Sequence, residues 1–70
     1  MEALATGRVP AGAEGPLSTL LNATPEPEIL AIVRAVSAGS GQAPKAVWRN
    51  GRALAKAVGC SRSVWLNDGS

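Results

Sequence analysis

Residues 52–70 read RALAKAVGCSRSVWLNDGS and contain the strongest local structural signals of this 70-residue chain. Ala, Leu and Lys favour a helix at the start of the stretch. Gly59 favours its end, because glycine readily adopts the left-handed conformation that closes many helices. Ser61 is a suitable cap for a new helix that begins at Arg62, and Val64–Leu66 give that helix apolar contacts. The stretch therefore predicts two short helices joined by a tight turn.

Upstream of the turn, four basic residues follow a helical spacing. Lys45, Arg49, Arg52 and Lys56 lie 4, 3 and 4 residues apart. On a helix with 3.6 residues per turn, these side chains form one line. The opposite side of the same helix is apolar and holds Val47, Trp48, Gly51, Leu54, Ala55 and Val58. The pattern predicts a helix that is cationic on one face and apolar on the other.

The dipeptide Asn50-Gly51 interrupts this pattern, because Asn-Gly favours a turn. A single Gly inside a helix nevertheless costs only about 1 kcal/mol relative to Ala. One continuous helix from Pro44, or two short helices over residues 44–49 and 52–58, are both compatible with the sequence. A β-hairpin at residues 50–51 is a third alternative, which the helix-forming residues on its far side weaken.

Two more helices are expected earlier in the chain. Residues 25–38 follow Thr24, a favourable N-cap, and precede Gly39, a favourable C-cap. Their apolar stripe consists of Ile29, Ile32, Val33 and Val36,. A shorter helix starts near Pro16 and ends by Thr24, because a proline follows. Its apolar face holds Leu17, Leu20 and Leu21,.

These elements predict a small all-α domain of three to four helices over residues 16–70. Residues 1–15 hold three Gly and one Pro and show no sustained periodicity beyond a turn at residues 1–5, so we expect a flexible N-terminal arm,. Of the 32 hydrophobic residues, 13 are Ala, which bury little surface,. A homodimer would add buried area to this thin core.

The polar composition excludes several kinds of site. The chain has no His and a single Cys, so it lacks the ligands of a zinc site and the Ser-His or Cys-His pair of a hydrolase,. We therefore expect neither an enzyme nor a cofactor. The longest strongly apolar run, residues 29–33, is too short to span a membrane,. The first residues also lack the basic and apolar segments of a secretory signal, and we expect a cytoplasmic protein without a membrane partner.

Charge is divided unevenly along the chain. Residues 1–33 carry four Glu and one Arg, a net charge of −3, whereas residues 34–70 carry six Lys or Arg and one Asp, a net charge of +5. This asymmetry predicts an anionic partner for the second half of the chain.

Residues 51–70 resemble the helix-turn-helix of bacterial and phage transcription regulators, with the two helices and the turn over residues 52–67. The resemblance depends on Leu54-Ala55, with the small Ala55 at the contact between the helices, and on Gly59 four residues later. Cys60–Ser63 resembles the entry to a recognition helix. Six residues after the glycine the family usually has Val or Ile, where this chain has Trp65. Either Trp65 takes over that packing, or the second helix is rotated.

The resemblance implies a DNA-binding transcription regulator that binds double-stranded DNA as a homodimer. In this family the second helix lies in the major groove. Ser61, Arg62 and Ser63 would then face DNA, with Arg62 on a guanine edge or a phosphate. The four basic residues of the preceding helix would lie along the DNA backbone; they are Lys45, Arg49, Arg52 and Lys56.

A second hypothesis belongs to another class. The chain would be a protein-interaction module that presents its basic amphipathic helix to an acidic or apolar partner. A membrane-active peptide is a third hypothesis, which the polar residues 60–63 and 67–70 do not fit,.

Overall fold

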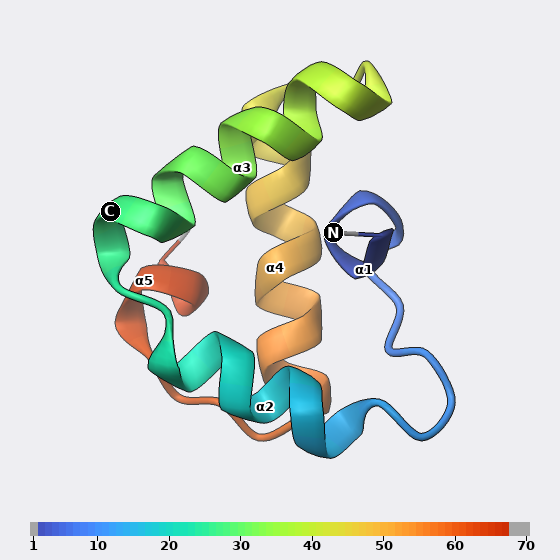
Figure 1. Cartoon of the computed structure of the whole chain (residues 1–70), viewed down its shortest axis with the longest axis vertical. Coiled ribbons are helices and arrows are strands. Elements are labelled where there is room, and N and C mark those ends of the chain that lie inside the picture. The colour runs from blue at the N-terminus through green and yellow to red at the C-terminus, as the bar shows by residue number, and fades with distance from the viewer. Residues whose placement is uncertain (1, 68–70) are drawn as a thin grey trace.

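The computed structural model describes residues 2–67, and the regular structure in this range consists of five helices without a strand (Figure 1). In chain order they are α1 (Glu2–Thr6), α2 (Glu14–Ala23), α3 (Glu26–Ser40), α4 (Pro44–Ala57) and α5 (Ser63–Leu66). The all-α class expected from the sequence is confirmed. Met1 and residues 68–70, which belong to the expected arm and to the stretch that resembles a helix-turn-helix, lie outside the described residues.

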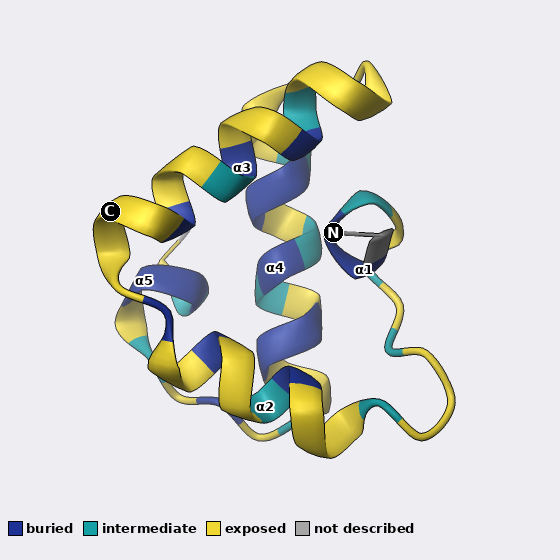
Figure 2. Ribbon diagram, in the orientation of Figure 1, coloured by how far each residue is buried: buried dark blue, intermediate teal, exposed yellow. Residues whose placement is uncertain are grey.

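Helix α4 lies at the centre of the molecule, where α1, α3 and α5 all contact it (Figure 1). Pro44 occupies its first turn, where the missing N–H of proline costs no hydrogen bond,. Val47, Leu54 and Ala55 on its apolar face have no exposed surface. Figure 2 shows this buried face as dark blue segments along α4. The apolar face expected from the spacing is confirmed.

α4 is one continuous helix that passes through Asn50-Gly51 without a turn. Long-range contacts explain why this dipeptide stays helical. The Asn50 side chain donates a hydrogen bond from Nδ2 to the carbonyl oxygen of Leu4 at 2.7 Å. A Cβ atom at Gly51 would come within 2.6 Å of the Trp65 ring, so glycine gives α5 the room to pack here. Of the three alternatives for this region, the single helix is observed, and the hairpin and the two short helices are not.

Both tryptophans belong to the core. The rings of Trp48 and Trp65 have centroids 5.7 Å apart and are tilted by 55°, a favourable arrangement for an aromatic pair. Their exposed fractions are 9% and 2%. Trp65 on α5 and Trp48 on α4 therefore pack on each other inside the core.

The first helix corrects the expectation of a flexible arm over residues 1–15. Leu4 on α1 is completely buried, and Ala3 is buried beside it. Two polar side chains hold the backbone of α1: Asn50 binds the Leu4 oxygen, and Gln42 Nε2 donates to the Ala5 oxygen at 2.8 Å. A five-residue helix shows no periodicity in the sequence, and its anchors lie far along the chain. Local patterns therefore could not reveal that this segment packs on the domain.

The helices α2 and α3 occur where the apolar spacing predicts them, but their caps differ. Thr24 does not cap α3; its hydroxyl donates to the Leu20 oxygen at 2.7 Å and so belongs to the end of α2. Pro25 occupies the N-cap position of α3. At the other end, Gly41 adopts the left-handed conformation with φ of 72°, two residues after the expected Gly39. Because Gly41 supplies the left-handed C-cap conformation, α3 continues past Gly39 and ends at Ser40.

Candidate nucleic-acid interface

The four basic residues of α4 lie along one side of a single helix, as their spacing predicts. We call Lys45, Arg49, Arg52 and Lys56 the basic face of α4. Three of the four side chains are exposed, and Arg52 is half-buried. From first to last they are eleven residues apart, which corresponds to about 16 Å along the helix axis,. The helix contains no acidic residue.

The turn after α4 has the geometry that its glycine predicts. Gly59 has φ of 74°. The N–H of Cys60 donates to the Ala55 oxygen at 2.7 Å, and the N–H of Gly59 donates to the Lys56 oxygen at 3.4 Å. These two bonds form a Schellman motif, which satisfies carbonyls at the end of the helix. Ala55 is fully buried.

The second helix is shorter than a recognition helix and begins later than expected. α5 has four residues, Ser63–Leu66, which corresponds to a length of about 6 Å,. Arg62 occupies the N-cap position, and no side chain caps the helix. The expectation that Ser61 caps a helix starting at Arg62 is therefore wrong. Ser61 and Ser63 are exposed, whereas Val64 and Trp65 are buried against the domain.

Arg62 binds the protein backbone. Its Nη1 atom donates to the carbonyl oxygens of Leu21 at 3.0 Å and Thr24 at 2.6 Å, and Trp65 Nε1 donates to the same Leu21 oxygen at 3.0 Å. The last carbonyls of a helix have no partner within it, and a cation near them is favoured by the helix dipole. Arg62 therefore acts as a cap for the C-terminal end of α2, at the place where the sequence suggested a DNA contact.

Sequence reasoning missed these internal roles. The last turn of α2 contains no basic residue, but the same is true of α3 and α5, so this feature does not single out Arg62. The roles of Asn50 and Gln42 left no signal in the sequence either. Their partners are 46 and 37 residues away in the sequence.

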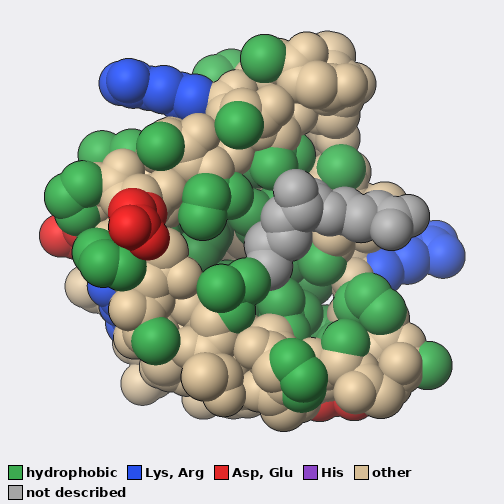
Figure 3. Space-filling view, in the orientation of Figure 1, with side chains coloured by type: hydrophobic (Ala, Val, Ile, Leu, Met, Phe, Trp, Pro, Cys, Tyr) green, Lys and Arg blue, Asp and Glu red, His purple; other side chains and the backbone are tan. Residues whose placement is uncertain are grey.

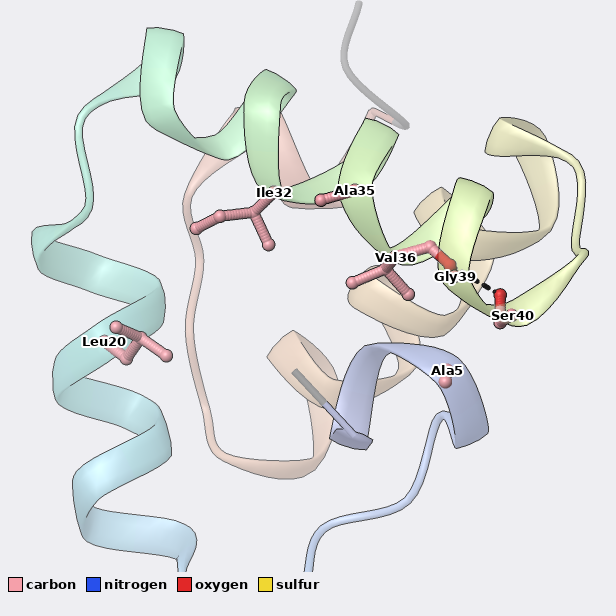
Figure 4. A pocket seen from close by; sticks show the side chains of 7 residues that line it. All are labelled: Ala5, Leu20, Ile32, Ala35, Val36, Gly39 and Ser40. Atoms are coloured by element: carbon pink, nitrogen blue, oxygen red, sulfur yellow. Dashed lines mark hydrogen bonds between the residues drawn. The ribbon is translucent and has the colours of Figure 1, made fainter.

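Another surface is an apolar groove of about 470 Å³ between α1, α2 and α3 (Figure 4). It is lined by Ala5, Leu20, Ile32, Ala35, Val36, Gly39 and Ser40. The hydroxyl of Ser40 donates to the Val36 oxygen at 2.6 Å, so the main polar group of the lining already has a partner. Figure 3 shows hydrophobic side chains around a hollow on this side of the molecule, with Lys and Arg only at the margins of the view.

The described part of the chain offers no metal site and no membrane span. Within residues 2–67, no group of three or more His, Cys, Asp and Glu side chains could hold a metal ion. No helix in the same range is long and apolar enough to cross a bilayer. Cys60 is buried, and its Sγ lies 3.5 Å from Asn22 Oδ1, to which it donates a hydrogen bond.

Comparisons with family models, with curated proteins and with solved structures give no match to this chain. The likeness of residues 51–70 to helix-turn-helix regulators thus stays a prediction from the residues themselves. The positions of the basic face of α4 and of Arg62 are the structural observations that bear on function.

Proposed function

We propose that this chain is a small DNA-binding protein that holds the phosphate backbone of DNA with the basic face of α4. The observation that supports this is the continuity of α4. Because the helix does not break at Asn50-Gly51, four cations lie in one line on its solvent side. The apolar side of the same helix is occupied by the core, so the basic face is the side that a partner can reach.

The expected strength follows from the release of counterions. A protein that neutralises four phosphates has a slope of about −3.6 in a plot of log affinity against log salt concentration. An increase from 50 to 200 mM salt then weakens binding by about 150-fold. Each cation that is removed from the face reduces the steepness of the slope by about 0.9.

The test is a fluorescence anisotropy titration of a labelled 20-base-pair duplex with the whole chain at several salt concentrations. Lys45→Gln and Arg49→Gln each remove one cation from the face, and we expect each to make the slope less steep by about 0.9. Arg34→Gln is the matched control, because Arg34 is an exposed cation on α3. A duplex that does not bind at 50 mM salt, or a control that weakens binding as much as Arg49→Gln, contradicts the proposal.

A second candidate function is protein interaction, and the apolar groove favours it. The apolar side of α4 is buried within the chain, so that helix can offer a partner only its basic face. The groove, by contrast, is open, and Leu20 on its wall is a large apolar side chain with 41% exposure. Association of two copies through this face would bury the apolar lining and the exposed Leu20 together, in the self-complementary way of a two-fold dimer,. We therefore propose a second copy of the chain as its occupant.

Sedimentation velocity over a range of concentrations tests the dimer. We expect the wild-type chain to associate and Leu20→Lys to stay monomeric, because the lysine charge would lose its hydration on association. The circular dichroism of Leu20→Lys should match that of the wild type, which shows that the variant is folded. Leu30→Lys is a matched control, since Leu30 is 44% exposed but does not line the groove. A wild-type chain that stays monomeric at high concentration rejects this second candidate.

A further inference from the structure

We infer that the basic face of α4 binds double-stranded DNA through its phosphates without reading the base sequence. This inference depends on the proposed function and adds that the DNA is double-stranded and that its base sequence is not read. It follows from where the structure places the side chains that could read bases.

The arginine expected to reach base edges is engaged elsewhere. The guanidinium of Arg62 donates to the Leu21 and Thr24 oxygens at 3.0 and 2.6 Å. Both bonds use Nη1 and hold the guanidinium at the end of α2, so turning Arg62 outward to bring Nη1 to a base edge would leave these carbonyls without their cap,. α5 is a single helical turn about 6 Å long, and Ser63 is its one exposed residue,. Two of its four residues are also buried against the domain. The helix is therefore too short and too embedded to act as a recognition helix.

The amide side chains, which pair well with adenine, are also engaged within the protein. Gln42 Nε2 donates to the Ala5 oxygen, and Asn50 Nδ2 donates to the Leu4 oxygen. Asn22 Nδ2 donates to the Ser18 oxygen at 2.8 Å, and its Oδ1 accepts from Cys60. The chain has one Gln and three Asn, so only Asn67, which is exposed after α5, is outside these contacts.

Single-stranded nucleic acid is disfavoured by the position of the aromatic rings. Proteins that hold single strands stack the bases on exposed aromatic side chains, which contribute about 1–3 kcal/mol per base. This chain has no Phe, Tyr or His. Its two tryptophans, Trp48 and Trp65, are both buried and pack on each other. The surface therefore offers charge to a backbone but no ring to an unpaired base.

The size of the basic face suits a duplex backbone. Its length of about 16 Å corresponds to about five phosphates of one strand, at 3.4 Å per step along the axis of the duplex,. Binding through phosphates alone has a dissociation constant of about 10⁻⁴–10⁻⁶ M at physiological salt. We expect the affinity of this chain to fall in that range for any sequence.

The experiment compares the whole chain on three labelled 20-base-pair duplexes of AT-rich, GC-rich and mixed sequence, and on one single strand of the same length, at 50 mM salt. We expect dissociation constants within about threefold for the duplexes and weaker binding of the single strand. Three variants, Ser61→Ala, Ser63→Ala and Asn67→Ala, remove exposed polar groups around α5, and they should leave the affinity within about twofold. A folded Arg62→Gln variant should also bind each duplex with an affinity within about twofold of the wild type.

Each outcome distinguishes the inference from the proposed function. Failure of every duplex to bind contradicts the proposed function itself. A preference of 100-fold or more for one duplex, or loss of binding in a folded Ser61→Ala, Ser63→Ala or Asn67→Ala variant, overturns the inference while DNA binding stands. Equal or tighter binding of the single strand overturns it as well.

Discussion

Gly51 provides a sharp test of how α5 is held on α4. A Cβ atom built at this position lies 2.6 Å from two ring atoms of Trp65 and 3.4 Å from Leu4 Cδ2. Ordinary contact begins at 3.4 Å, so Gly51→Ala requires a relative displacement of about 0.8 Å,. The ring cannot simply turn away, because Trp65 Nε1 is bonded to the Leu21 oxygen at 3.0 Å and the ring packs on Trp48.

The expected free energy change combines two opposing effects. Alanine is favoured over glycine inside a helix by about 1 kcal/mol. Overpacking a core typically costs about 1–3 kcal/mol, and a weakened hydrogen bond of a buried group adds about 1 kcal/mol. The steric effect is larger, so we expect Gly51→Ala to lower the free energy of unfolding by about 1–3 kcal/mol.

Gly39→Ala is the matched control. Gly39 lies inside α3, is exposed, and has no atom within 4 Å of the site of a new Cβ. Only the helix preference acts there, so this variant should gain about 0.5–1 kcal/mol. The same chemical change is thus expected to destabilise the protein at one position and stabilise it at the other.

Urea denaturation followed by circular dichroism and by tryptophan fluorescence measures both variants. Fluorescence also reports directly on Gly51→Ala, because the displaced ring is one of only two tryptophans. If Gly51→Ala is as stable as the wild type, or if both variants shift in the same direction, the packing of α5 against α4 described above is wrong.

Other contacts give further predictions. Arg62→Gln removes the cation at the end of α2 and should lower the free energy of unfolding by about 1–3 kcal/mol in urea denaturation,. Asn50→Ala leaves the Leu4 oxygen without its side-chain donor and should lower the free energy of unfolding by about 1 kcal/mol,. Relative to the wild type, amide hydrogen exchange should increase more in α1 than in α3. Cys60 is 4% exposed, so an aromatic disulfide reagent should react with it slowly in the native protein and rapidly in urea,.

Local signals predicted the elements that local interactions decide. The Schellman turn at Gly59 and the apolar stripe of α3 arise within a few residues and occur where the sequence predicts them. In the predicted stripe of α2, Leu17 and Leu21 are buried, but Leu20 is 41% exposed. The end of α3 was misplaced because two glycines, Gly39 and Gly41, are two residues apart. Local rules do not choose between them, whereas the structure ends the helix at the second.

The remaining features depend on partners far along the chain. Asn50-Gly51 favours a turn in isolation. In the fold, the Asn50 side chain binds the Leu4 oxygen and the Trp65 ring packs against Gly51. The same contacts place α1, which has too few residues for a periodic pattern. The line of cations on the candidate site was predictable from spacing. The position of Arg62 was not, because its acceptors precede it by 41 and 38 residues.

The contacts between residues far apart in the sequence explain how a domain with so few large apolar residues is held together. Within residues 3–67, the core has six fully buried large side chains, all aliphatic. Uncharged amides and one arginine add hydrogen bonds between segments that are far apart in the sequence. Those are the same residue types that read DNA bases. With these side chains held by the fold, the proposed binding by the basic face depends on charge contacts with phosphates. Stability and affinity should then respond to different substitutions. Changes at Asn50 or Arg62 alter the free energy of unfolding, and changes at Lys45 or Arg49 alter the salt dependence of binding.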